Sequence, residues 1–282
     1  MRNNKRREKI AFFFLFLATL LIVIPVGMVV VIIVVKGLPA INWQFLSDIP
    51  RQGMRSGGIF PAIVGTVYLV LGAIIFALPI GLLAAIYLSE YARENLLNRL
   101  IKLSIVNLAG VPSVVYGLFG LALFVVFFKF GASILSGSLT LGIMILPIII
   151  TTSREALESV PQSFREVSLS LGASKWQTIR YVVLPNAIPG VITGTILGLG
   201  RAAGETAPIL FTVAAFYLPQ LPKSIFDQAM ALPYHLYVIS TQVPNVGEKV
   251  RYGTALVLLA LVLFMNLVAI LIRYKFRKKK KW

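Results

Sequence analysis

The chain has 282 residues, of which 58% are hydrophobic, and it contains no cysteine and a single histidine. This hydrophobic share is typical of a membrane protein and excludes an ordinary soluble domain of the same length. The missing cysteines exclude a disulfide framework and a thiolate metal site, and one histidine cannot form a multi-histidine metal site.

The net charge of +17 could indicate a nucleic-acid-binding protein, but the basic residues are placed otherwise. They cluster in the two tails, beside the first and last apolar segments. Such clusters are typical of cytoplasmic ends that lie next to anionic lipid. We therefore expect contact with membrane lipid and no nucleic-acid partner.

Six apolar segments predict an all-α, polytopic membrane protein with six transmembrane helices. Most are long enough to cross a hydrocarbon core of ~30 Å, and the fourth is short. The predicted spans are residues 10–35, 60–88, 105–128, 139–152, 190–215 and 254–272. Pro79, Pro112 and Pro147 lie within or near spans and predict kinks.

Six spans place both termini on one side of the membrane, and the basic loops after the second and fourth spans share that side. The positive-inside rule identifies it as cytoplasmic. We expect one transmembrane domain, residues 1–282, that includes a cytoplasmic loop at residues 154–188. Two long external loops follow the first and fifth spans, and we expect His235 at the surface of the second.

The cytoplasmic loop predicts two short helices with a sharp turn between them. Ser163-Phe-Arg-Glu166 and Ser174-Lys-Trp-Gln177 fit capping boxes at two helix starts, and Gly172 suits a left-handed helix end. Pro185 and Pro189 are expected to stop the second helix before the next span. Such a pair could lie on lipid or dock a cytoplasmic protein, and the glycine-centred turn favours docking.

The fifth span carries two ionisable residues in a glycine-rich run. Gly190, Gly194, Gly198, Arg201 and Glu205 recur at three- and four-residue steps, which predicts one helix face. Beside this face lie two further glycines, Gly200 and Gly204. Small residues let membrane helices approach closely, and a charge at membrane depth costs at least ~2.5–3.5 kcal/mol. Two hypotheses remain open: an ion pair that locks the bundle, or an Arg201 that meets an anionic solute while Glu205 holds it in place.

The cytoplasmic loop resembles that of permease subunits of bacterial ABC importers, which reads E-A-A, three residues, G, nine residues, I-x-L-P. Here Glu166-Val-Ser takes the place of E-A-A, Gly172 follows at the same spacing, and Val182-Val-Leu-Pro185 ends the motif. In that family the loop is a coupling helix that docks into an ATPase subunit. The resemblance implies ATPase-coupling contacts at Glu166, Leu171, Gly172, Ala173, Leu184 and Pro185.

The run Gly198-Leu-Gly-Arg-Ala-Ala-Gly-Glu-Thr-Ala-Pro208 closely resembles the A-type (PstA-like) permease subunits of phosphate-specific ABC importers. This resemblance implies a type I ABC importer permease fold in the cell inner (plasma) membrane. It also implies ATP-driven import of inorganic phosphate past Arg201 and Glu205. The implied partners are a homologous second permease (PstC-like), two ATPase subunits (PstB-like) and an extracytoplasmic phosphate-binding protein (PstS-like).

The chain has no G-x-x-x-x-G-K-[ST] sequence, so we do not expect it to be an enzyme or to hold a cofactor. A partner ATPase would bind ATP and Mg²⁺. Physical reasoning from the residues alone reaches only an anion transporter. Open alternatives are an ABC permease for another oxyanion, such as molybdate or sulfate, an ion-coupled secondary anion carrier with Glu205 as the ion site, and a membrane sensor that recruits partners.

Overall fold

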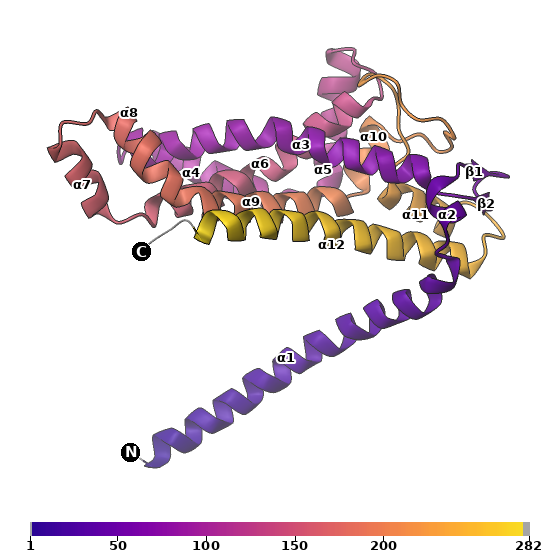
Figure 1. Ribbon diagram of the computed structural model, residues 1–282, viewed down its shortest axis with the longest axis horizontal. Coiled ribbons are helices and arrows are strands. Elements are labelled where there is room, and N and C mark those ends of the chain that lie inside the picture. The colour runs from indigo at the N-terminus through magenta and orange to yellow at the C-terminus, as the bar shows by residue number, and fades with distance from the viewer. Residues whose placement is uncertain (1, 279–282) are drawn as a thin grey trace.

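The computed structural model describes residues 2–278, which are mainly helical (Figure 1). Lys279 to Lys281, part of the predicted basic C-terminal cluster, lie outside the described residues. Five segments are long and apolar enough to cross a membrane: Ala11–Ala40, Phe60–Tyr91, Ile134–Glu158, Lys175–Gly204 and Glu248–Arg277. A bent pair, Leu96–Ala109 and Ser113–Phe127, makes a sixth if it is one span. The described residues therefore match the predicted class of polytopic all-α protein.

The elements follow one another as a series of long helices with short ones between them. The first half contains α1 (Arg2–Gly37), η1 (Leu38–Ala40), α2 (Trp43–Ser47), β1 (Pro50–Arg51), β2 (Ser56–Gly57), α3 (Phe60–Ile86), η2 (Tyr87–Tyr91), α4 (Leu96–Ala109), α5 (Ser113–Gly120) and η3 (Leu121–Phe127). The second half contains α6 (Ile134–Glu158), α7 (Gln162–Ser170), α8 (Lys175–Thr178), η4 (Ile179–Val183), α9 (Leu184–Gly204), α10 (Ala207–Thr212), α11 (Leu232–Thr241) and α12 (Glu248–Lys278).

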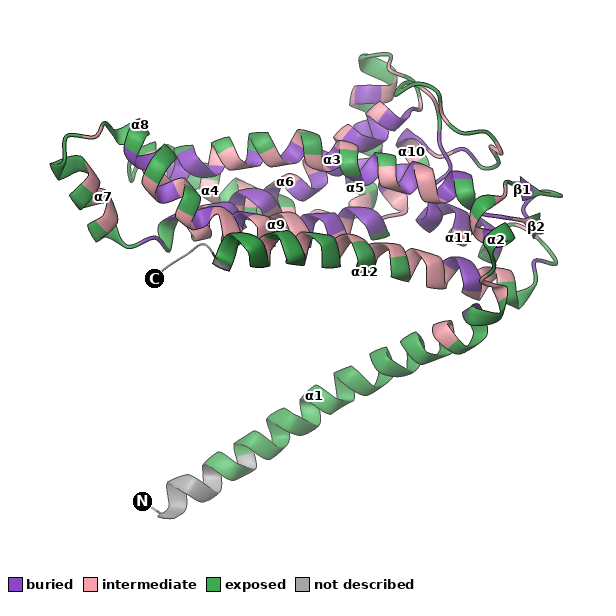
Figure 2. Cartoon of the chain, in the orientation of Figure 1, coloured by how far each residue is buried: buried purple, intermediate pink, exposed green. Residues whose placement is uncertain are grey.

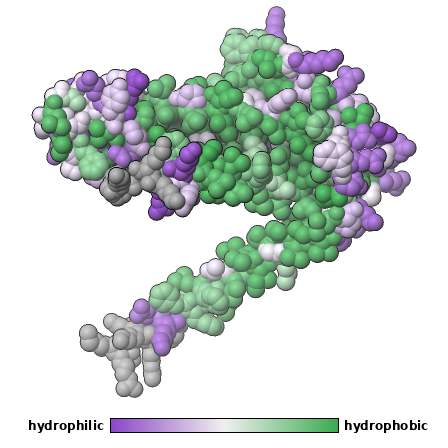
Figure 3. Space-filling view, viewed as in Figure 1, coloured by the Kyte–Doolittle hydropathy of each residue, from purple (hydrophilic) through white to green (hydrophobic). Residues whose placement is uncertain are grey.

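The α6 helix is the centre of the bundle. It packs against α3 and α9, and α12 covers the far side of α9 (Figure 2). Leu141, Met144, Ile145 and Ile149 of α6 are fully buried in the main apolar core. By contrast, α1 contacts the rest of the chain mainly through α12 and projects away from the bundle (Figure 1). An apolar band covers the middle of the long helices, and polar residues gather at both ends of the bundle (Figure 3).

Glycines allow α9 to lie directly on α6. A Cβ on Gly190 would collide with Ala156, and one on Gly194 would collide with the Thr152 hydroxyl. On Gly198 it would only make an ordinary contact, 3.5 Å from Ile145. The other two glycines expected in packing make no tight contact within the described chain: a Cβ on Gly200 would lie 3.7 Å from Asn266, and one on Gly204 would meet nothing within 4 Å.

The predicted fifth span, residues 190–215, is wrong at both ends. The helix begins at Lys175, continues through η4 and α9, and stops at Gly204. Pro185 and Pro189, expected to end a helix before the span, lie within this continuous segment. The π-helical turn of η4 ends two residues before Pro185, and such a wide turn changes which carbonyl faces the proline ring. The second loop helix and the fifth span therefore form one continuous rod.

The predicted third span, residues 105–128, is wrong as a single helix. It divides into α4 and α5, which are bent by 102°. Pro112, expected to produce a kink, breaks the helix because proline has no N–H and disfavours helical backbone at the preceding residue. Beyond the break α5 packs against both α10 and α6.

The fourth span is longer than the predicted residues 139–152, since α6 begins at Ile134 and ends at Glu158. Polar residues do not end it, because their hydroxyls bond within the helix. Thr140 donates to the Ser136 carbonyl and Thr152 to the Ile148 carbonyl, each at 2.7 Å.

His235 is not a surface residue as expected, because 3% of it is exposed. It lies in α11, a short helix outside the candidate spans that packs on α3 and α12. Burial lowers the pKa of His235 to about 4, so its imidazole is neutral at physiological pH. The helical spacing of the apolar residues around it could have predicted this burial.

Gly194→Ala is expected to destabilise the bundle, because the added methyl group has to push α6 and α9 apart. The loss should be about 1–3 kcal/mol, which is typical of overpacking. Thermal unfolding in detergent measures it. Gly27→Ala in α1 is the control, since a Cβ there meets nothing within 4 Å. Equal stability of the two variants would contradict the packing of α9 on α6.

Candidate functional site

The two ionisable residues of the fifth span lie where its helix ends. Arg201 is in the last turn of α9, whereas Glu205 follows the helix with an extended backbone (φ −78°, ψ 136°). The predicted shared helix face is therefore wrong for Glu205. The two still form an ion pair with 3.6 Å between Arg201 Nε and Glu205 Oε1, and 27% and 19% of their side chains are exposed. A pair this long and open leaves guanidinium donors accessible to another anion.

A second helix break lies beside the first. A Cβ on Gly117 of α5 would lie 3.0 Å from the carbonyl oxygen of Ala207 in α10. The neighbouring Tyr116 is buried and donates its hydroxyl to the Leu108 carbonyl of α4 at 2.7 Å, across the break. Broken helices free backbone groups inside a membrane, and transporters bind solutes at such positions. The Arg201–Glu205 pair thus lies where a solute site is physically reasonable.

The loop at residues 154–188 contains the two predicted short helices, α7 and α8. Gly172 has a φ of +85° and a Cβ there would meet nothing within 4 Å, so the turn needs glycine for its backbone and not for space. The capping box at α8 is confirmed: Ser174 Oγ accepts from Gln177 N at 3.3 Å, and Gln177 Oε1 accepts from Ser174 N at 2.7 Å.

The first predicted capping box, Ser163 with Glu166, is wrong. The α7 helix begins at Gln162 after Pro161, and no side chain caps it. Proline has a fixed φ that suits a helix start. The helix therefore begins before Ser163, and both residues of the expected box lie inside it.

The residues expected to contact an ATPase fall into two groups. Glu166, Leu171, Gly172 and Ala173 are in or beside the turn at the tip of the loop, and 83% of Leu171 is exposed. The second group lies at the base of the loop, where Leu184 is half-buried and Pro185 is exposed. An exposed apolar tip at the polar end of the bundle (Figure 3) is typical of a surface that binds another protein.

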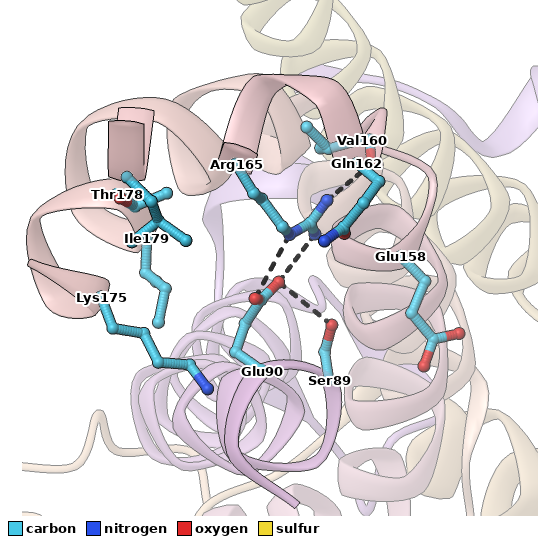
Figure 4. A pocket seen from close by; sticks show the side chains of 10 residues that line it. Ser89, Glu90, Glu158, Val160, Gln162, Arg165, Lys175, Thr178 and Ile179 are labelled. Atoms are coloured by element: carbon cyan, nitrogen blue, oxygen red, sulfur yellow. Dashed lines mark hydrogen bonds and ion pairs between the residues drawn. The ribbon is translucent and has the colours of Figure 1, made fainter. Parts of the chain in front are cut away.

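An ion pair that the sequence did not indicate joins this loop to the spans (Figure 4). Arg165 of α7 donates from Nη2 to Glu90 Oε1 at 2.7 Å and from Nε to Oε2 at 3.3 Å. Glu90 is in η2, at the end of the second span. Their side chains are 12% and 8% exposed. The only signal in the sequence was an acidic residue directly after an apolar span, which alone names no partner.

A small apolar cluster lies beside this pair. Its buried members come from the ends of three long segments: Ala85, Ile86, Leu157, Val160, Ile179, Val183 and Ala187. Phe164 of α7 and Leu184 pack against it. The loop therefore rests on the C-terminal ends of α3 and α6 and on the rod that continues into α9.

Residues 77–282 match the family described as "Binding-protein-dependent transport system inner membrane component". The chain is 33% identical over 250 residues, 84% of each chain, to the probable ABC transporter permease protein YqgI of Bacillus subtilis. It is 35% identical over 234 residues, 83% of this chain and 74% of the relative, to the phosphate transport system permease protein PstA 1 of Mycobacterium tuberculosis. A chain in the crystal structure of a bacterial alginate ABC transporter with its periplasmic protein has a similar fold, with a TM-score of 0.65 at 15% identity over 95% of this chain and 93% of that one.

The chain belongs to this family of binding-protein-dependent inner-membrane transport components. It is a permease subunit of an ABC importer, with the type I permease fold and several spans in the inner membrane. As a transport subunit it has no catalytic role and binds no nucleotide, and it associates with ATPase subunits, a second permease and a binding protein. The secondary carrier and the sensor, left open by the residues alone, are thereby set aside.

Gly172→Val is expected to weaken the loop turn, because a β-branched residue is strained by about 1–2 kcal/mol or more at positive φ. The amount of ATPase that copurifies should fall while membrane insertion persists. Gly131→Val is a matched control: Gly131 also has positive φ (+68°) and open space around it, but it lies in the loop between η3 and α6. Equal ATPase recovery from both variants would count against docking through this turn.

Proposed function

We propose that this subunit forms, with a homologous second permease, the pathway of an ATP-driven importer of inorganic phosphate. The observation that carries the proposal is the half-buried Arg201–Glu205 pair at a break in the fifth span. The similarity to permeases named for phosphate transport, at 34–36% identity over most of the chain, supports phosphate as the anion.

Arginine suits this substrate because its planar guanidinium can donate two parallel hydrogen bonds to phosphate oxygens. Without phosphate, Glu205 neutralises Arg201 at 3.6 Å. With phosphate, the guanidinium exchanges part of this weak pair for stronger bonds, and Glu205 repels the anion so that it is not held too tightly. The two residues thus neutralise each other when the pathway is empty, and Arg201 binds the anion when the pathway is occupied.

The energy for transport comes from the ATPase subunits. We assign ATPase coupling to residues 154–188, through Glu166, Leu171, Gly172, Ala173, Leu184 and Pro185. ATP binding closes the ATPases and shifts the loops, which opens the pathway outward, and hydrolysis resets it. The rod Lys175–Gly204 connects this loop to Arg201 without an interruption. The partners we assign are PstC-like, PstB-like and PstS-like subunits.

Both termini are expected on the cytoplasmic side, since the basic residues of the tails and of the loops at 92–102 and 154–180 then share it. A reporter fused after Trp282 should report the cytoplasm. The same reporter inserted at the exposed Gln220 should report the outside. An external reporter after Trp282, or a cytoplasmic one at Gln220, would overturn this topology.

Arg201→Gln is expected to abolish most phosphate uptake by the reconstituted complex. A hydrogen bond to a charged group contributes about 1.5–3 kcal/mol, so uptake should fall about ten- to hundredfold. The single change also leaves the Glu205 carboxylate without its positively charged partner, which can reduce assembly. Arg201→Gln with Glu205→Gln leaves no unpaired charge and should restore assembly without restoring uptake.

Radiolabelled phosphate uptake, measured beside complex yield, separates these effects. Arg51→Gln is the control, because Arg51 forms an exposed ion pair with Asp48 in the first external loop. Sulfate and molybdate are tested in parallel, and preferential uptake of either would replace phosphate as the substrate. Substantial phosphate uptake by the double variant would leave the Arg201–Glu205 pair as scaffolding only.

A further inference from the structure

We propose that Glu90 and Arg165 form the link through which movement of α7 reaches the ends of α3 and α6. Both are positioning residues and neither contacts the solute. This inference depends on the coupling role proposed above for residues 154–188. It adds the element that makes the coupling loop and the spans move as one body.

Arg165 joins three elements at once. Besides its two bonds to Glu90 of η2, it donates from Nη1 to the Val160 carbonyl at 2.7 Å and from Nη2 to the Leu157 carbonyl at 2.9 Å. Leu157 is in the last turn of α6, and Val160 follows it. The last carbonyls of a helix have no partner within the helix, so a guanidinium there satisfies them and complements the helix dipole.

Only arginine can make this set of contacts from one side chain. Its fork presents five N–H donors in a fixed plane, whereas a lysine ammonium is a compact point charge. In Figure 4 the guanidinium lies between the Glu90 carboxylate and the chain at Val160, and Ser89 lies on the other side of Glu90. Ser89 Oγ donates to Glu90 Oε1 at 3.4 Å, which helps to hold the carboxylate in position.

Two other ion pairs of the described residues differ from this one. Arg154–Glu158 (3.4 Å) lies within α6, and Lys102–Glu94 (3.3 Å) lies beside α4 with 93% of the Glu94 side chain exposed. Such exposed pairs are screened by water and contribute little. Glu90–Arg165 is shorter, at 2.7 Å, and more buried. It connects segments far apart in the sequence, as a mechanical link requires.

The link is needed because α7 is otherwise attached to the bundle by few contacts. The helix lies between the turn at 159–161 and the turn at Gly172, and most of its residues are exposed. Phe164 packs on the small apolar cluster, and Ser168 shares a hydrogen bond with Thr178 at 2.9 Å. A force applied by a docked ATPase at Leu171 or Val167 would otherwise tilt α7 without moving α3.

Two variants and a matched control test the proposal in the complete complex with its ATPase and second permease. Arg165→Lys keeps the charge but cannot reach Glu90, Leu157 and Val160 together. Glu90→Gln keeps the shape but removes the charge. Arg154→Lys makes the same chemical change in an ion pair that lies within α6, outside α7, the turn at Gly172 and the six residues to which ATPase contact is assigned. In both test variants, solute moved per ATP hydrolysed should fall about tenfold or more, a typical coupling magnitude, while the ATPase still binds.

A distance measurement supplies a readout that stability alone does not change. The chain has no cysteine, so spin labels at Ser163→Cys in α7 and Arg93→Cys after η2 are the only ones on this subunit. With Glu90 and Arg165 intact, trapping with ATP and vanadate should leave their distance unchanged, because both sites move together. In the Arg165→Lys and Glu90→Gln variants, trapping should shift the distance between the two labels and broaden its distribution. In the Arg154→Lys variant, trapping should change neither.

Three results would overturn the link. The first is a distance that changes on trapping while both residues are intact. The second is unchanged solute transport per ATP in assembled variants. The third is loss of assembly in both variants but not in Arg154→Lys, which would make the pair a folding element. The distance measurement requires no transported solute, so a complex that moves no phosphate would contradict the proposed substrate and leave this test valid.

Discussion

Close contact of α6 with α3 and α9 is the constraint on which the rest of the structure depends. Apolar side chains gain little by leaving lipid for another apolar surface, so membrane helices associate through tight packing and polar contacts. Gly190 and Gly194 bring α9 onto α6, and Gly81 and Gly142 do the same where α3 meets α6. Because α6 is held on both sides, the part of α9 around Gly190 and Gly194 is fixed relative to α3.

The two helix breaks expose backbone polar groups that continuous helices would not expose. A membrane helix satisfies its own backbone, and each break leaves N–H and C=O groups that need other partners. Here the break between α4 and α5 and the break between α9 and α10 lie next to each other, since Gly117 packs on Ala207. Arg201 and Glu205 lie at the same place. A polar region inside an otherwise apolar bundle is costly to build, and passage of an anion is a sufficient reason for it.

The features that depend on residues close together in the sequence were predicted well. Apolar length predicted membrane spans, and the Ser174 capping box and the positive φ of Gly172 were confirmed. The features that depend on contacts between helices were predicted poorly. Pro185 is accommodated by the π-helical turn before it, whereas Pro112 breaks its helix, and no rule of composition separates the two. Glu90 and Arg165 are 75 residues apart, so their pairing follows only from how α3 and α7 meet.

The continuity of α8, η4 and α9 determines where the molecule can bend. One route by which movement of the loop at residues 154–188 can reach the spans is the rod Lys175–Gly204, whose 30 residues span about 45 Å. A second route runs through Arg165 to α3 and α6. Both routes end in helices that glycines hold in close contact, so the half of the bundle nearest to this loop resists internal rearrangement. We infer that displacement of the loop is absorbed at the helix breaks near Pro112 and Glu205, and the opening then occurs beside the charges that would hold the anion.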